Sequence, residues 1–262
     1  MSLRVTVRSA FGPLAAAMAV AAVVAPTLVA SSAEAQARSN AQAEQSRSMR
    51  ERIFGRSLPP TGRYVSESGE GFIWDRTAAT PLMRFDRSVE TWALRGSAAP
   101  RGDILYRNDA GELILRVTAD GGMTLYTRRA PSGSPVSLAG PGERLTPTTL
   151  GPVQMFSLMA RRSALVSRSL GRLVEINVSG ERSEALSVDA LVVTTDTVMR
   201  MARSATARGY VSRLRSITIT EGARASVTYA GGNLRVVVDP SRGPAGRPSS
   251  ARIIQAFADA ES

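Results

Sequence analysis

The sequence predicts an α+β protein: an N-terminal antiparallel β-meander, a helical middle, and a C-terminal three-stranded antiparallel β segment with a terminal short helix. Three observations support this class. Short runs of alternating apolar and polar residues fill residues 61–129, helical spacing of apolar residues dominates 153–208, and alternation returns after residue 212. The chain has 262 residues and no cysteine, so its stability must come from a buried core and not from disulfide bonds.

Residues 1–37 have the composition of a secretory signal peptide. Two arginines precede an apolar run at 14–30, and the small-x-small triplet that ends at Ala37 fits a signal peptidase site. We therefore expect cleavage at Ala37 and a periplasmic or secreted bacterial protein. The alternative is an uncleaved membrane anchor, but the run is short for a span and Pro26 interrupts it. A polar leader, disordered or helical, is expected at 38–60.

The β-meander at 61–129 is predicted from short runs rich in β-branched and aromatic residues, such as "RYVSES", "GFIWDR", "PLMRFD" and "TWALRG". The clearest part is "DILYR", "ELILRVT" and "MTLYTRR", separated by "NDAG" and "ADGG". Leu113, Leu115 and Val117 fall on one face of their strand because side chains alternate. Four-residue loops that end in Gly fit a type I turn followed by a left-handed residue.

Residues 130–152 are rich in Pro and Gly and predict a linker. Residues 153–262 then predict an α+β half that forms one compact domain with residues 61–129. Helices are expected at 153–170 and 188–208, with a strand at 172–179 between them. Three strands follow, joined by turns at "EG" and "GGN", and a short amphipathic helix closes the chain.

The residue inventory excludes most catalytic chemistry. Without His, Cys or Lys, the chain cannot form a Ser-His-Asp triad, a thiolate nucleophile, a Ser-Lys dyad or a Schiff base. Imidazole and thiolate zinc sites are excluded too, and no phosphate-binding glycine motif occurs, so no metal or cofactor is expected. Carboxylate acid–base chemistry is what remains for an enzyme, and the inventory favours a non-catalytic protein.

The formal net charge is +11, and every basic residue is an arginine. Arginine presents a planar fork of donors that pairs with phosphate or carboxylate groups. For an exported protein, the partners that fit are an anionic glycan, a lipid headgroup or an acidic protein. Nucleic acid is not an expected partner, because export takes the protein out of the compartment that holds it. No transmembrane span is expected after signal cleavage.

One segment combines arginines with a predicted helix start. Arg242 and Arg247 precede Ser249 and Ser250, and free N–H groups at a helix N-terminus bind anions. We therefore predict an anion-binding site at these four residues. The alternative is an ordinary helix after a turn, capped by Ser249 or Ser250.

Carboxylates near the predicted hairpin turns suggest a second class of function. Asp103 and Asp109 would serve a hydrolase that acts on envelope glycan if the hairpin bordered a cleft. The simpler interpretation is turn chemistry, since Asp and Asn are favoured in turns. The triplet Arg101-Gly102-Asp103 is interpreted as incidental and not as an adhesion signal. A third alternative, an inhibitor or lipophilic carrier, requires the N-terminal strands to close around a cavity.

The segments "PRGDILYRNDAGELILRVT", "GRYVSESGEGFIWDR" and "GRPSSARI" resemble an exported bacterial family that is catalogued only as a domain of unknown function. The resemblance covers most of the chain, from about residue 49 to residue 257. It agrees with export. It implies no activity and no catalytic residue, because none is assigned to that family.

Overall fold

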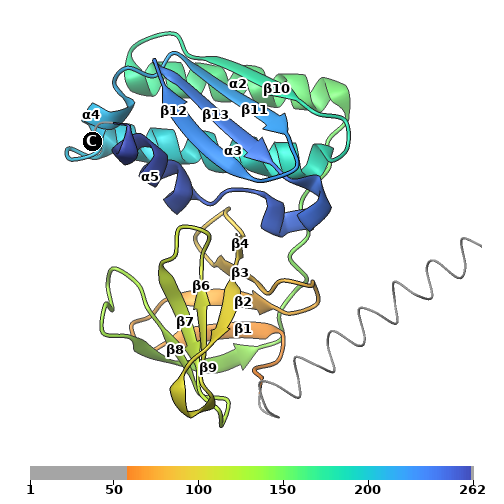
Figure 1. Ribbon diagram of the computed structural model, residues 1–262, viewed down its shortest axis with the longest axis vertical. Helices are drawn as coiled ribbons and strands as arrows, with labels where there is room; N and C mark the ends of the chain where they lie inside the picture. The colour runs from red at the N-terminus through yellow and green to blue at the C-terminus, as the bar shows by residue number, and fades with distance from the viewer. Residues whose placement is uncertain (1–57, 261–262) are drawn as a thin grey trace, which may run out of the picture. The chain divides into compact units, whose positions relative to one another are not determined.

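The computed structural model describes residues 58–260, all of which belong to one compact unit. The predicted signal peptide, its cleavage site at Ala37 and most of the predicted leader lie outside the described residues. Within them the α+β class is confirmed: an N-terminal antiparallel sheet is followed by helices, further strands and a terminal helix (Figure 1).

The N-terminal sheet has nine strands in the order β4-β3-β2-β1-β9-β8-β7-β6-β5, and all neighbours are antiparallel. The predicted meander is therefore confirmed. A short 3-10 turn, η1, covers Pro100–Gly102. The strands are β1 Gly62–Ser66, β2 Gly71–Asp75, β3 Leu82–Phe85, β4 Trp92–Ala93, β5 Arg95–Ala98, β6 Ile104–Arg107, β7 Leu113–Val117, β8 Met123–Leu125 and β9 Ser134–Gly140.

Strand β9 lies inside the range that the sequence predicted as a linker. It pairs with both β8 and β1, with Tyr64 opposite Leu138. The run contains Pro135 and mostly exposed side chains, so it lacks the apolar alternation by which strands are predicted. Strand β9 matters because it joins strands β1–β4 to strands β5–β8 in one sheet. The two edge strands of the sheet are β4 and β5. Along the chain they are separated by a single residue, the buried Leu94.

The turns between β6, β7 and β8 have the conformation that the sequence predicts. Gly111 and Gly121 have φ angles of 86° and 91°, in the left-handed region that glycine tolerates without strain. The N–H of each glycine donates a hydrogen bond that closes its turn, from Gly111 to the carbonyl oxygen of Asn108 and from Gly121 to the carbonyl oxygen of Thr118. These tight turns fix the register of the central hairpins.

Side chains fill the space that the N-terminal strands enclose. The rings of Trp74 and Tyr106 meet edge to face with centroids 5.0 Å apart, and Phe72 stacks on Tyr64. Trp74, Phe72 and Leu115 are fully buried. The aromatic residues that the sequence places on these strands therefore form a core, stabilised by apolar burial.

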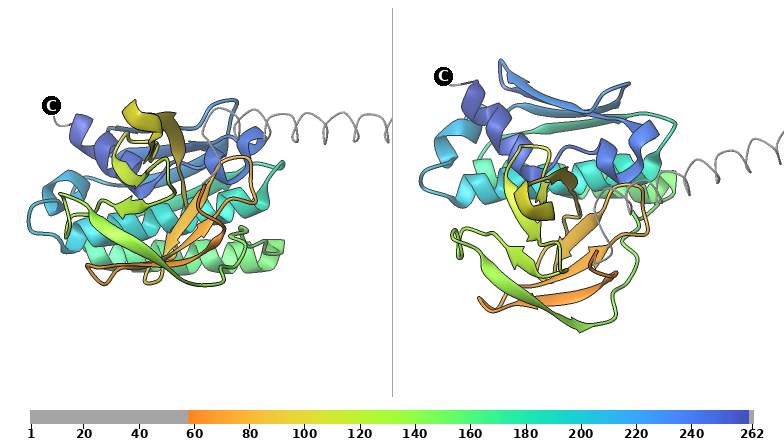
Figure 2. Two further views of the ribbon diagram at one scale, coloured as in Figure 1. Left: turned by 90° about the horizontal axis from the view of Figure 1, so that it is seen from below. Right: turned by 60° about the horizontal axis from the view of Figure 1, so that its bottom comes forward.

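The C-terminal half contains helices on one face of a second sheet (Figures 1 and 2). Helices α2 and α3 pack together, and α5 packs against α3 and β12. The elements are α2 Pro152–Leu170, β10 Glu175–Ser179, α3 Glu184–Arg203, α4 Arg208–Val211, β11 Ser216–Glu221, β12 Ser226–Ala230, β13 Asn233–Val238, the 3-10 segment η2 Pro240–Gly246 and α5 Ser250–Asp259.

Helix α3 begins four residues before the predicted start and ends earlier than predicted. Its N-cap is Ser183, whose side chain accepts a hydrogen bond from the N–H of Leu186. The β-branched run at 192–195 is helical because Val193 and the preceding Leu191 are buried in the core. Tertiary packing here outweighs the weak helix propensity of β-branched residues.

The predicted three-stranded antiparallel segment is a four-stranded mixed sheet in the order β10-β11-β13-β12. Strand β13 pairs parallel with β11 and antiparallel with β12, so "GGN" is a hairpin turn and "EG" is not. Strand β13 takes the inner position because Leu234, Val236 and Val238 are all fully buried, and such a strand avoids an edge. Alternation reveals which face is buried, but it does not reveal which strands are neighbours.

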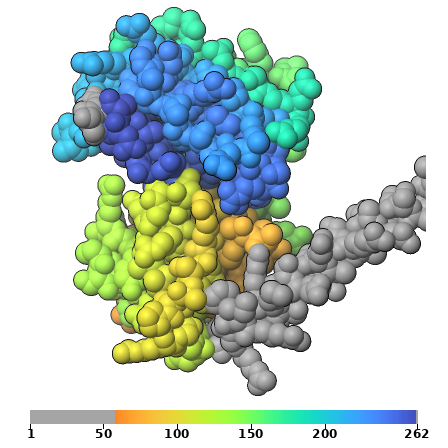
Figure 3. Space-filling model, in the orientation of Figure 1, coloured from red at the N-terminus to blue at the C-terminus, as the bar shows by residue number. Residues whose placement is uncertain are grey.

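The second face of this sheet has no helix on it among the described residues. It carries side chains such as Thr218, Thr228 and Arg235. In the space-filling view of the same orientation, β12 and β13 form a broad blue surface (Figure 3).

Candidate functional site

Arg247 is the centre of a buried polar network, and only 2% of its side chain is exposed. Its Nε donates to Asp189 Oδ2 at 2.6 Å, and its Nη1 donates to the carbonyl oxygen of Pro248 at 2.7 Å. Nη2 donates to the carbonyl oxygen of Thr91. The carboxylate of Glu90 completes the network, with Oε1 3.6 Å from Nη1.

The network stabilises the charge of Arg247. Burial opposes that charge, but the carboxylates of Asp189 and Glu90 outweigh it and raise the pKa of Arg247 above its ordinary value. Burial also raises the pKa of Asp189, against the lowering effect of Arg247. All three nitrogens of the guanidinium donate to acceptors within the chain, so Arg247 has a structural role here.

The N-terminus of α5 holds two carboxylates that belong to the chain itself. The N–H of Ser249 donates to Asp109 Oδ2 at 2.8 Å, and the N–H of Ser250 donates to Glu90 Oε1 at 2.7 Å. Ser249 is also the N-cap, since its hydroxyl accepts a hydrogen bond from the N–H of Arg252. Free N–H groups at a helix start attract anions, and here the anions come from two distant loops.

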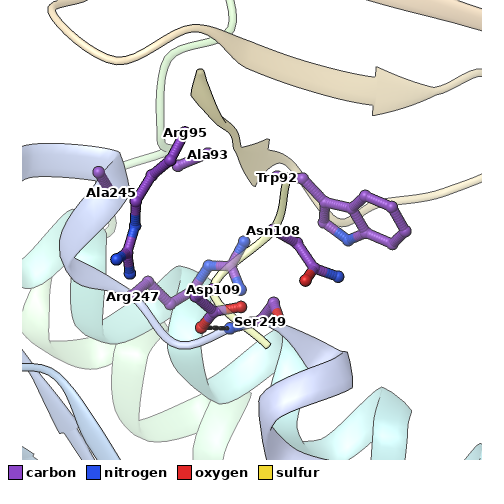
Figure 4. Close-up of a pocket in the computed structure, with 8 residues that line it drawn as sticks. All are labelled: Trp92, Ala93, Arg95, Asn108, Asp109, Ala245, Arg247 and Ser249. Atoms are coloured by element: carbon purple, nitrogen blue, oxygen red, sulfur yellow. Dashed lines mark hydrogen bonds between the residues drawn. The ribbon is translucent and has the colours of Figure 1, made fainter. Parts of the chain in front are cut away.

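A cavity of about 10 Å³ lies beside this network, which is room for about one water molecule. Oδ1 of Asp109 is buried and has no hydrogen-bond partner among the described residues. Figure 4 shows the side chains of Arg95, Asp109 and Arg247 around the cavity, with the bond from Ser249 to Asp109 as a dashed line. Its lining residues are Trp92, Ala93, Arg95, Asn108, Asp109, Ala245, Arg247 and Ser249.

Arg242 lies apart from the other three residues of the predicted anion site. It is exposed in η2 and borders an open groove of about 430 Å³. Residues 78–80 also line this groove. The structure therefore brings Arg247, Ser249 and Ser250 together around internal carboxylates, and leaves Arg242 as the one predicted residue that is open to solvent.

Asp103 and Asp109, the predicted hydrolase pair, are not brought together. Asp103 immediately precedes β6 and Asp109 follows its far end. The side chain of Asp103 is 8% exposed and accepts a hydrogen bond from Arg116 Nε at 2.7 Å. Asp103 is thus committed to an ion pair, and the Arg-Gly-Asp triplet does not present its carboxylate to solvent.

The neighbouring polar residues of the hairpin have turn roles. Asn108 Oδ1 accepts hydrogen bonds from the N–H groups of Ala110 and Glu112, at 3.1 and 3.0 Å. Thr118 Oγ1 donates to Asp120 in the next turn. These are the local side-chain interactions for which turns select Asn, Asp and Thr.

Exposed arginines from three segments gather at one end of the C-terminal half. Nη1 of Arg172 donates to the carbonyl oxygen of Ser212 at 2.7 Å, which joins the end of α2 to the loop after α4. No ion pair in residues 58–260 includes any of these arginines. We call this group the arginine end; it consists of Arg168, Arg172, Arg208, Arg213 and Arg215.

Residues 42–257 match the family described as "Domain of unknown function (DUF4908)". The chain belongs to this family. The resemblance to a family without an assigned function is thereby confirmed, over nearly the range that the sequence indicated. No curated protein and no solved structure matches the chain.

In this DUF4908 chain, the sequence interpretation missed Glu90 and Asp189. Asp189 did leave a signal: it is a lone carboxylate within the apolar run "SVDALVV", and such a residue needs a buried partner. The grouping of Arg208, Arg213 and Arg215 with Arg168 and Arg172 was also missed, because these arginines come together only in the fold. No helix in the described part of this DUF4908 chain is long and apolar enough to cross a membrane.

Proposed function

We propose that this protein is a non-catalytic, exported binding protein that attaches through exposed arginines to an anionic partner. The observation that carries the proposal is the arginine end, where five exposed arginines converge without an ion pair in the described part of the chain. An anionic envelope component or an acidic protein supplies the charge that this group lacks. Export rests on the signal-like residues 1–37.

The chemistry of arginine supports this proposal. Each guanidinium offers a planar fork of donors that fits phosphate, sulfate or carboxylate oxygens, and it stays charged at any physiological pH. Arg172 is already oriented by its bond to Ser212, so less side-chain entropy is lost when an anion binds. Exposed charges at close spacing attract a polyanion cooperatively, and the attraction weakens as salt screens it.

The test measures binding of the purified chain to heparin, a sulfated glycan used as a general polyanion, at low and high salt. The triple variant Arg168→Gln, Arg213→Gln, Arg215→Gln removes three charges from the arginine end. The matched control Arg87→Gln, Arg128→Gln, Arg129→Gln removes three exposed charges from the N-terminal half.

We expect the wild-type chain to bind at low salt and to lose at least about tenfold in affinity in high salt. The arginine-end variant is expected to weaken binding about tenfold, and the control variant less than about twofold. Absence of binding at low salt would overturn the proposal. Equal losses in the two triple variants would show that net charge, and not the arginine end, determines binding.

A further inference from the structure

Helix α2 carries large apolar side chains on its solvent side. Val153 is 80% exposed, Phe156 73% and Leu165 41%, and Leu173, three residues beyond the helix, is 75% exposed. The largest apolar residues of a folded protein are usually buried. Only one residue of this 19-residue helix is fully buried, so most of its surface faces outward.

The same surface is cationic. The segment 152–173 contains no Asp or Glu, whereas it contains Arg161, Arg162, Arg168 and Arg172. Arg162 turns toward α3 and pairs with Asp196, and the other three are exposed and take part in no ion pair in the described part of the chain.

Helical geometry places these groups on the half of α2 that faces away from Val166, with Phe156 and Leu165 about 180° apart at its two edges. With 3.6 residues per turn, Val153, Ala164 and Arg168 fall opposite the buried Val166, and Arg161 lies next to them. Phe156 and Leu165 flank this strip on its two sides. We call this surface, with Arg172 and Leu173 at its end, the α2 face.

We propose that the α2 face lies on the surface of a lipid bilayer that contains anionic lipids. This inference rests on the proposed function and names the partner class. Helices that lie in a membrane interface combine exposed Phe and Leu with arginines, so that apolar side chains enter the acyl boundary while the cations contact lipid phosphates. The arginine end continues the same surface, because Arg168 and Arg172 belong to both.

The polar side chains of the α2 face favour a bilayer over an acidic protein. The hydroxyl of Ser157, which points away from Val166, donates its proton to the carbonyl oxygen of Val153 at 2.9 Å. Nε of Arg161 donates to the carbonyl oxygen of Ser157 at 3.3 Å. Hydroxyls satisfied within the helix offer a protein partner no pattern of free donors, and they lower the cost of entering the bilayer interface.

The test is co-sedimentation of the purified chain with vesicles of phosphatidylcholine, with or without about one third phosphatidylglycerol. Two apolar variants, Phe156→Ser and Leu173→Ser, keep every arginine. Two control variants, Val89→Ser and Leu138→Ser, remove apolar side chains of similar exposure, 63% and 55%, from the N-terminal half. Heparin binding and oligomeric state, by light scattering, are measured for each protein.

We expect anionic vesicles to be bound at least about fivefold more strongly than neutral ones. Each apolar variant should lose about fivefold on vesicles and keep its heparin affinity within about twofold, because its charge is unchanged. The controls should bind vesicles like the wild type.

Four results would overturn the inference. If the wild-type chain binds heparin but not anionic vesicles, the bilayer is the wrong partner and the proposed function stands; if it binds neither, both fail. If Phe156→Ser and Leu173→Ser bind vesicles normally, the α2 face is not the contact. If the chain forms a dimer that Phe156→Ser abolishes, the α2 face belongs to a second copy.

Discussion

Arg247 Nε and Asp189 Oδ2 are 2.6 Å apart, although 58 positions separate the two residues in the sequence. We expect Arg247→Leu to lower the free energy of unfolding by about 3–5 kcal/mol, because it leaves the carboxylates of Asp189 and Glu90 buried without their cation. Arg247→Lys should recover part of the loss, since lysine keeps the charge and loses the planar fork.

Urea unfolding monitored by tryptophan fluorescence measures this effect. The matched control is Arg242→Leu, which removes an exposed arginine from the same segment and should change stability by less than about 0.5 kcal/mol. Equal stability of Arg247→Leu and the wild type would show that the network contributes nothing to the fold.

Asp75 gives the fold a pH dependence. Its two carboxylate oxygens accept hydrogen bonds from the N–H groups of Thr77 and Leu145, both at 2.8 Å. Burial acts to raise the pKa of Asp75, but these two bonds, the side-chain hydrogen bond with Thr77 and the charge of Arg144 together outweigh it and lower the pKa below the ordinary value. The stability that Asp75 contributes is therefore present above the ordinary carboxyl pKa and is lost as pH falls through the lowered one.

We expect Asp75→Asn to cost about 2–4 kcal/mol at pH near 7, and less as the pH falls below the ordinary carboxyl pKa toward the lowered pKa of Asp75. Thermal unfolding of both proteins across this range measures the difference. Asp86→Asn is the control: it removes the exposed partner of Arg63, worth no more than about 1 kcal/mol. A cost for Asp75→Asn that did not change with pH would contradict the assignment.

Ser249 caps α5 through the N–H of Arg252. Ser249→Ala should reduce the free energy of unfolding by about 1 kcal/mol, the usual cost of losing an N-cap oxygen. Ser132→Ala, at an exposed position, provides the baseline and should remain within about 0.5 kcal/mol of the wild type. Chemical denaturation distinguishes the two, and a Ser249→Ala protein as stable as Ser132→Ala would rule out the cap.

Gly246 is required by close packing. A Cβ atom at this position would lie 1.9 Å from the carbonyl oxygen of Asp239, so the backbone of η2 would have to shift. We expect Gly246→Ala to destabilise the protein by about 1–3 kcal/mol. Gly151, before α2, has no atom within 4 Å of its would-be Cβ, and Gly151→Ala should be close to neutral. Similar melting temperatures for the two variants would contradict this account.

The parts of the fold that the sequence predicts are those with local causes. The hairpins β6–β7–β8 follow from alternation and from the left-handed glycines Gly111 and Gly121, all within one short stretch. Strand β9 and the inner position of β13 depend on pairing with distant strands, which no local pattern encodes. The prediction for the C-terminal sheet was therefore correct in its strands and wrong in which strands are neighbours.

At the candidate site, too, the sequence predicts the features with local causes and misses those that depend on distant residues. A helix start with affinity for anions at Ser249 and Ser250 was predicted, because a serine cap and the free N–H groups behind it are local properties. The carboxylates found there, Glu90 and Asp109, come from loops 160 and 140 positions away. Such occupants depend on tertiary contacts and cannot be inferred from the helix start itself.

The pairing of β1 with β9 has a consequence for how the chain folds. All other neighbours in the N-terminal sheet are consecutive along the chain, but Tyr64 reaches Leu138 only after the whole intervening meander has been formed. Closing such a long loop is slow, so this step should limit the folding rate of the sheet. Until then β1 has an unpaired edge, and a chain that stopped before Ser134 would keep that edge permanently open to strands of other copies.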